Sequence, residues 1–360
     1  MMKKTARVID GNTSLLLDSL RILAALTVLL YHAYDQWFPS SINTAGFYGR
    51  SAHEAVIVFF VLSGYLIAHA TSSNRTEIQY ASARLSRLCS VVIPALIVTF
   101  IIQIIVVKIS PYLGTTYTRG SSLPRYLMAG SFINEIWKFS AAPPINSPLW
   151  SLSYEFWYYA IFGLWIYKKS GWRGLIFPLI ACLIAGPKIL LLMPVWLAGS
   201  YAYRYQPPVK GKLAWCFVFI AIALSILGMI YLPIYPLQIG APPFFFSNQF
   251  VTDYVLGIFV AVALWCLPSG NRSEKKPKWI LWYRTFSDLT FPVYVLHYPL
   301  LVLWRALFSF KAYDVMQMWE AVITALIISL LLGALFESKR PQWADFFKKY
   351  LTRLKEFKSN

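Results

Sequence analysis

Cysteine, histidine and acidic residues are scarce in this chain, and each scarcity argues against a class of protein. Its 360 residues include 4 Cys, 4 His and 15 Asp and Glu, against 33 Lys and Arg. The cysteines are scattered without Cys-x-x-Cys spacing, so the sequence predicts neither a disulfide framework nor a zinc site, and we expect no metal. Charged residues make up only 13% of the chain, whereas a soluble domain has about a quarter.

Long apolar runs are what the chain has in abundance. Hydrophobic residues make up 58% of it and its mean hydropathy is +0.55, which is typical of a polytopic membrane protein. No small-residue cleavage site follows the first run, so we expect it to remain as a span. The sequence predicts an all-α bundle of about ten spans, at about 15–33, 54–70, 89–107, 149–167, 174–187, 189–203, 213–232, 249–267, 287–308 and 319–336. The fifth and sixth are short enough to be tilted, broken or partly re-entrant.

The basic residues concentrate in alternate connections between these spans. Lys3, Lys4 and Arg7 precede the first span, and another basic group, within 272–284, precedes the ninth. This alternation predicts that both termini lie in the cytoplasm. The positive excess then faces an anionic leaflet, so we expect membrane lipids and not nucleic acid as its partner.

We expect one membrane domain, 1–341, followed by a basic amphipathic cytoplasmic tail, 342–360. Aromatic and leucine residues recur in the tail at three-and-four spacing between cations, which predicts an interfacial helix. The longest connection, 108–147, is rich in apolar residues and is predicted to be a folded lid or binding element. The outer aromatics Trp137 and Trp150 offer faces for a sugar ring, and they equally suit an interfacial aromatic belt.

An arginine and a histidine share one face of the first span. Arg21 and His32 are eleven residues apart, so a helix places them on one face with about 16 Å between them along the axis. Ionisable groups inside a membrane are costly and are functional candidates by default. Arg21 is a candidate for anion binding, although it can also snorkel to the inner headgroups beside Asp18. His32 is a candidate catalytic base or a hydrogen-bonded interior histidine.

Two further patterns suit the binding of an anionic ligand from the inner side. Arg84 and Arg87 are three residues apart on a predicted helix, so both are expected to face the same way. Arginine forks suit phosphate oxygens, and the pair is also what an ordinary positive-inside flank looks like. Ser63 and Gly64 in the second span allow either close helix packing or a narrow passage.

The remaining candidates are acidic residues and histidines. Glu155 lies in the outer half of the fourth span and needs a partner there, for which a histidine is the natural choice. His53 and Glu54 form a second such pair or a polar helix start. His297, in the ninth segment, is either structural or lines a cavity, and His69 is predicted to be structural.

Taken in order, these motifs resemble the integral-membrane acyltransferase family 3, bacterial enzymes that O-acylate extracytoplasmic glycans. The resemblance extends from about Leu15 to Pro341. Its motifs are Leu17-Asp-Ser-Leu-Arg21 with His32, Phe59-Phe-Val-Leu-Ser-Gly-Tyr-Leu-Ile67, Arg84-x-x-Arg87, Trp150-Ser-Leu-Ser-Tyr-Glu155-Phe, Tyr294-Val-Leu-His297-Tyr-Pro, and Glu337 before Pro341.

The resemblance implies a multi-pass O-acetyltransferase of the bacterial inner membrane. Acetyl-CoA is the expected donor, docking with its phosphates on Arg84 and Arg87 and with Arg21 deeper along the path. A polysaccharide or lipid-linked saccharide is the expected acceptor, and partners in glycan assembly or export follow from it. His32 then acts as general base or carries the acyl group, and Glu155 orients it or contacts the acceptor.

Two alternatives stay open. A transporter or flippase would also have intramembrane charges, and it predicts inverted repeats, of which the sequence shows no convincing sign. A structural subunit of a polysaccharide export complex predicts that Arg21 and His32 are dispensable.

Overall fold

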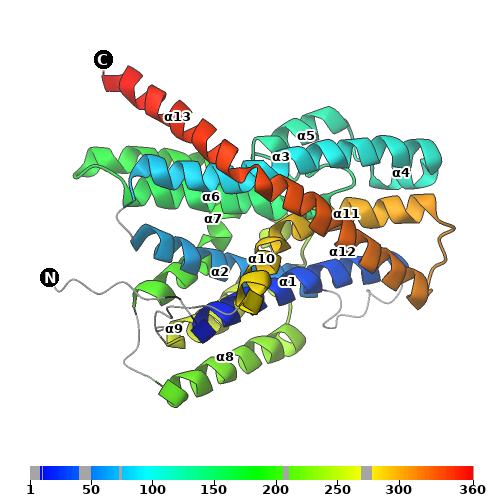
Figure 1. Cartoon of the computed structure of the whole chain (residues 1–360), viewed down its shortest axis with the longest axis horizontal. Helices are drawn as coiled ribbons and strands as arrows, with labels where there is room; N and C mark the ends of the chain where they lie inside the picture. Colours follow the sequence, from blue (N-terminus) through cyan, green and yellow to red (C-terminus); the bar gives the residue numbers. More distant parts are fainter. Residues whose placement is uncertain are drawn as a thin grey trace. The chain divides into compact units, whose positions relative to one another are not determined.

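The computed structural model describes residues 9, 11–39, 50–72, 75–205, 211–268 and 278–359, and within these ranges the chain forms helices and no strands (Figure 1). Lys3, Lys4, Arg7 and most of the basic connection before the ninth predicted span lie outside the described residues.

The helices follow one another along the chain, and the described residues also include three single-turn 3-10 helices. In order they are α1 (Gly11–Trp37), α2 (Ser51–Ser72), α3 (Glu77–Ile109), α4 (Pro111–Tyr117), α5 (Ser122–Gly130), η2 (Ser147–Leu149), α6 (Trp150–Ile166), η3 (Trp172–Leu175), α7 (Ile176–Arg204), α8 (Gly211–Tyr231), η4 (Phe245–Ser247), α9 (Phe250–Cys266), α10 (Lys278–Asp288), α11 (Thr290–Leu307), α12 (Val315–Ser338) and α13 (Arg340–Ser359).

All ten predicted apolar segments fall on these helices. In the described part of the chain, six helices are long and apolar enough to cross a membrane: α1, α2, α3, α7 with η3, α8 and α12. A seventh span results if α10 and α11, which meet at a bend of 45°, are taken together. With 17 residues each, α6 and α9 are shorter than the usual span. The described part of the chain is therefore all-helical, with six to seven candidate membrane spans by length and composition.

The predicted fifth and sixth segments are two parts of α7. The helix is interrupted at Gly186, whose φ of 79° and ψ of 176° are non-helical. A side chain at this position would meet the backbone of Trp137, with 2.8 Å between its Cβ and the Trp137 nitrogen. Glycine is needed here both for the backbone angle and for the close approach. The break explains why the sequence reads as two short apolar runs.

The residues divide into two compact units. The first comprises 1–31, 40–74 and 190–290, and the second comprises 32–39, 75–189 and 291–360.

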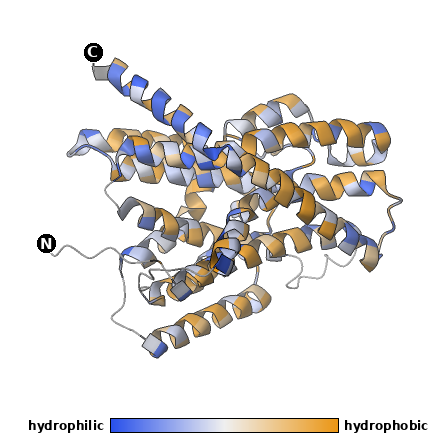
Figure 2. Cartoon of the chain, viewed as in Figure 1, coloured by the Kyte–Doolittle hydropathy of each residue, from blue (hydrophilic) through white to orange (hydrophobic). Residues whose placement is uncertain are grey.

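In the first unit, α9 packs against both α2 and α8. Close contact between α2 and the second part of α7 depends on two glycines. A Cβ on Gly64 would lie 1.9 Å from the carbonyl oxygen of Trp196, and one on Gly199 would lie 1.9 Å from that of Val61. Only glycine lets the two backbones approach so closely. The outward faces of α8 are apolar, as expected for contact with hydrocarbon (Figure 2).

In the second unit, α3 contacts α4, α5, α6, α12 and α13 (Figure 1). It begins with a capping box, in which the side chains of Thr76 and Gln79 satisfy each other's backbone N–H groups. The predicted tail is the helix α13, which packs along α3 and joins it through an ion pair between Lys355 and Glu77. Its exposed side carries Phe346, Tyr350 and Phe357, together with cations.

Candidate functional site

Two imidazole rings meet inside the second unit. His32, near the end of α1, stacks on His297 of α11 with 5.3 Å between ring centroids and 25° between ring planes. The ring of Tyr298 stands edge-on to His32, with centroids 5.0 Å apart. His297 is completely buried, whereas His32 keeps part of its surface exposed. The sequence named both histidines separately, and the fold brings them together.

The backbone of α11 fixes the tautomer of His297. Its Nδ1 lies 2.7 Å from the carbonyl oxygen of Tyr294 and 3.2 Å from that of Val293. A carbonyl oxygen can only accept, so Nδ1 carries the proton and Nε2 carries the lone pair. Nε2 is buried and has no hydrogen-bond partner among the described residues. A free lone pair beside a second imidazole is a proton-accepting arrangement.

A proline shapes the same turn of α11. Pro299 has no N–H, so the carbonyl of Val295 lacks its helical partner. The side-chain amide of Asn146 replaces it, donating to the Val295 oxygen at 2.9 Å and to Thr99 Oγ1 at 3.2 Å. Asn146 thereby ties the end of the 131–149 connection to the helix that carries His297.

Tyrosine and charged side chains continue from the histidine pair. Tyr298 contacts the ring of Tyr117, whose hydroxyl accepts a hydrogen bond from Arg305 at 3.3 Å. Asp35, three residues after His32 on α1, lies within electrostatic range of Arg305. Sequence analysis did not single out Asp35, Tyr117 or Arg305, although Asp35 stands one helical turn from His32.

Glu155 accepts a short hydrogen bond from the hydroxyl of Tyr159, one turn further along α6. It also lies within electrostatic range of Tyr294. The Tyr294 hydroxyl bonds to Ser151 and to the carbonyl of Pro148, and its ring centroid is 6.0 Å from that of His297. Tyr294 therefore interacts with both Glu155 and His297, and connects Glu155 to the histidine pair.

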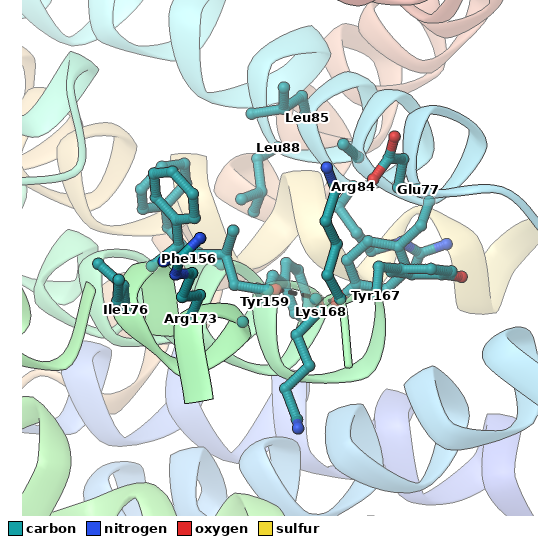
Figure 3. A pocket seen from close by; sticks show the side chains of 18 residues that line it. Glu77, Arg84, Leu85, Leu88, Phe156, Tyr159, Tyr167, Lys168, Arg173 and Ile176 are labelled. Atoms are coloured by element: carbon teal, nitrogen blue, oxygen red, sulfur yellow. Dashed lines mark hydrogen bonds between the residues drawn. The ribbon is translucent and has the colours of Figure 1, made fainter. Parts of the chain in front are cut away.

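A cavity of about 770 Å³ lies in the second unit between α3, α6 and the start of α7 (Figure 3). Its inner wall is apolar, with Leu88 and Phe156 among the lining side chains. Arg84 reaches into it from α3, and the connection between α6 and α7 adds Lys168, Lys169 and Arg173. An apolar cavity with a few cations is a suitable site for an amphiphilic anion.

The two arginines of the Arg84-x-x-Arg87 motif have different surroundings. The Arg84 guanidinium carbon lies 5.9 Å from the ring centroid of Tyr159 and faces the cavity. The Arg87 guanidinium lies over the ring of Phe291, with its carbon 5.6 Å from the centroid, and does not line the cavity. We expected both side chains to face the same way, but only Arg84 lines the cavity. A separation of three residues in a helix leaves about 60° between side chains.

A buried ion pair holds the 131–149 connection in place. Lys188, just after the break of α7, donates to Glu135 at 2.6 Å and to the carbonyl of Phe139, and both charged side chains are fully buried. The Trp137 amide donates to the Ala185 carbonyl at 3.3 Å. The predicted folded element is present, but its anchor was missed. Lys188 is the single cation inside the apolar stretch 174–203, which was the available signal.

In the first unit, Arg21 belongs to an ion cluster formed by α1 and α10. Its Nη1 lies 3.8 Å from Asp18 and 3.6 Å from Asp288. Asp18 also accepts a hydrogen bond from Ser287 and faces Arg284 at 4.0 Å. The contact with Asp18 is the one that the snorkelling interpretation predicts.

His53 and Glu54 do not pair with each other, which corrects that part of the sequence interpretation. His53 Nε2 lies 3.1 Å from both carboxylate oxygens of Asp253 on α9, and Glu54 pairs with Arg50 at 2.8 Å. Arg50 also donates to the carbonyl of Met229 near the end of α8. Adjacent residues in a helix point about 100° apart, so neighbours in sequence take separate partners.

Three other candidates occupy packed positions. Ser63 accepts a hydrogen bond from the indole of Trp196, and Gly64 lies against the backbone of the same residue. Both contacts are close helix packing, one of the two roles that the sequence allowed. Trp150 is buried edge-on against Tyr154. No group of three or more His, Cys, Asp or Glu in the described part of the chain could hold a metal ion.

Comparison with known proteins supplies a family. A family model described as an acyltransferase domain matches residues 15–337. No curated protein and no solved structure matches the chain significantly. The matched region contains every candidate residue described above and ends just before α13. The chain therefore belongs to acyltransferase family 3 and is a multi-pass membrane acyltransferase.

Proposed function

We propose that this acyltransferase moves an acyl group, acetyl in the simplest case, from cytosolic acyl-CoA to a hydroxyl of an extracytoplasmic or lipid-linked carbohydrate. Family membership supplies the reaction class. The second unit supports an anionic donor and base or nucleophile chemistry, because it contains both an anion-compatible cavity and an imidazole pair.

The donor end is the cavity between α3, α6 and α7. Arg84 and the cations Lys168, Lys169 and Arg173 suit phosphate groups, because guanidinium and ammonium groups form charge-assisted hydrogen bonds with phosphate oxygens. The apolar inner wall suits a thioester-bearing arm. Its volume of about 770 Å³ lies in the range of small-molecule sites. In this proposal Arg87 assists donor binding from outside the cavity. The other candidates for donor binding lie in the first unit: Arg21, Ser63 and Gly64.

One observation carries the proposal: a line of side chains runs from the cavity to the histidines, and its members are in contact except for Glu155 and Tyr294, which lie within electrostatic range of each other. Arg84 lies beside the ring of Tyr159, and Tyr159 bonds to Glu155. Glu155 interacts with Tyr294, whose ring adjoins His297, and His297 stacks on His32. A donor bound at Arg84 would therefore lie at one end of a line of side chains that ends at an imidazole.

The chemistry then falls to His32. It acts as general base on the acceptor hydroxyl or carries the acyl group between donor and acceptor. Glu155 is the carboxylate candidate for orienting the site, acting through Tyr294 or on the acceptor itself. His53, Glu54, Trp150 and His297 are lower-ranking candidates for contacts with the acceptor.

The proposed setting is the bacterial inner membrane, with both termini in the cytoplasm. Ten spans in this proposal require that α6, α9 and both parts of α7 each cross or enter the bilayer. The exposed aromatic side chains of α13, flanked by cations, support an interfacial position for this helix. Polysaccharide assembly or export proteins are the partners that this location suggests.

The deciding experiment follows labelled acetyl from acetyl-CoA into the glycans of membranes that contain the full-length chain. The unsubstituted protein should transfer label. His32→Ala should abolish transfer at equal expression, and His69→Asn, which alters a histidine bonded to Tyr203 in the first unit, should leave it intact. Label that never leaves acetyl-CoA would favour a transporter, and normal transfer by His32→Ala would remove His32 from the mechanism.

A further inference from the structure

The two ring nitrogens of His297 have very different surroundings. His297 is fully buried, its Nδ1–H is committed to backbone carbonyls, and its Nε2 lone pair has no hydrogen-bond partner among the described residues. A buried acceptor without a donor costs about 1–3 kcal/mol. Such a cost is usually retained where the group has a chemical role.

The stacking geometry adds a second, independent observation. The rings of His32 and His297 are within 25° of parallel, with centroids 5.3 Å apart. At this separation, groups held at the edges of the two rings can meet. An acyl carbon bonded to one ring and a hydroxyl hydrogen-bonded to the other can then approach to about 3 Å, the separation that reaction requires.

We propose that the two histidines divide the reaction, with His32 carrying the acyl group and His297 Nε2 serving as the general base that deprotonates the acceptor hydroxyl. This inference rests on the proposed function, and it selects the covalent route. An acylated His32 is a poor base, because the acyl group withdraws electrons from the remaining ring nitrogen. A second imidazole with a free lone pair is therefore needed.

A nitrogen of His32 attacks the thioester carbonyl, the carbon–sulfur bond breaks, and coenzyme A leaves as the thiol with the proton from the other His32 nitrogen. In the second step the acceptor oxygen bonds to the acyl carbon while its proton passes to His297 Nε2. The carbon–nitrogen bond breaks, and the proton on His297 moves to His32, which restores both neutral imidazoles.

His297→Asn provides a selective test, because the asparagine amide can replace the Nδ1–H donor to the Tyr294 carbonyl but has nothing at the position of Nε2. Membranes with the full-length protein would be given labelled acetyl-CoA, and label would be measured separately in the protein and in the glycan. We expect transfer to glycan to fall at least a hundredfold in His297→Asn, in line with loss of a general base. Label should remain on the protein and disappear in the double variant His32→Ala/His297→Asn.

The outcomes separate this inference from the proposed function. If the unsubstituted protein transfers no acetyl, the proposed function fails. If it transfers acetyl and His297→Asn does so at a similar rate, or loses transfer without retaining protein-bound label, the division between the histidines is overturned. The thermal midpoint of His297→Asn shows whether it folds. If it does not fold, His297→Gln, which places an amide near the position of Nε2 and cannot act as a base, is put through the same measurement.

Discussion

The side-chain amide of Asn146 occupies the place of a missing backbone donor, bonding at 2.9 Å to the Val295 carbonyl that Pro299 leaves without a partner. The bond joins a connection outside the helices to the turn of α11 that carries His297. It links a rule of local structure, that proline has no N–H, to the positioning of a candidate active-site residue.

Asn146→Ala should lower the free energy of unfolding by about 1–3 kcal/mol, because it leaves a buried carbonyl without a donor. Pro299→Ala restores an N–H that can bond to Val295, so Asn146→Ala should cost less in that background. Thermal unfolding of the four purified proteins in one detergent gives the coupling between the two positions. Equal losses in both backgrounds would show that Asn146 does not compensate for Pro299.

Lys188→Met should be among the most damaging single substitutions, because it leaves Glu135 buried without its cation. Breaking a buried pair from one side costs about 3–5 kcal/mol. The double variant Lys188→Met/Glu135→Leu removes both charges and should regain much of the loss. The stability of each variant is compared as the fraction of protein that elutes as a single species after mild heating. A double variant no better than Lys188→Met would mean that the ion pair is not the anchor.

Gly64→Ala should prevent normal assembly of the first unit, because its Cβ would lie 1.9 Å from the Trp196 carbonyl oxygen. We expect a loss of about 3 kcal/mol, at the upper end of overpacking effects, or no folded protein. Gly130→Ala is the matched control, since a Cβ there lies 3.5 Å from Leu96, an ordinary contact. Similar yields and thermal midpoints for both variants would contradict the close packing of α2 and α7.

Arg84→Gln should weaken acetyl-CoA binding more than Arg87→Gln does. Arg84 lines the cavity, and loss of a charge-assisted hydrogen bond of about 1.5–3 kcal/mol corresponds to roughly tenfold to a hundredfold in affinity. Arg87 lies over Phe291 and should change affinity by a small factor. Equilibrium binding of labelled acetyl-CoA to purified protein distinguishes them. A larger effect at Arg87 would place the donor outside the cavity.

Periodicity and hydropathy were sufficient to locate the long apolar helices, because burial in lipid requires apolar runs of defined length, but they did not predict the short helices α4 and α5. At α7 they predicted two short segments and allowed for a broken helix, and the structure places the break at Gly186. They also predicted that α6 and α9 cross the bilayer, whereas with 17 residues each these helices are shorter than the usual span.

The candidate site was predictable in its members but not in their pairings. His32, His297 and Glu155 were each identified as polar residues in apolar runs. The stacking of His32 on His297 joins residues 265 positions apart, and His53 finds Asp253 on another helix instead of its neighbour Glu54. Such contacts depend on how helices rotate and pack, which a single sequence does not specify.

The reciprocal contact of Gly64 and Gly199 has a mechanical consequence. Each glycine accommodates a backbone carbonyl of the opposite helix, so the backbones of α2 and the second part of α7 are in direct contact at two points. Neither helix can slide along the other without a collision. We therefore expect the two helices to move together, as one rigid body, in any movement of the first unit during turnover.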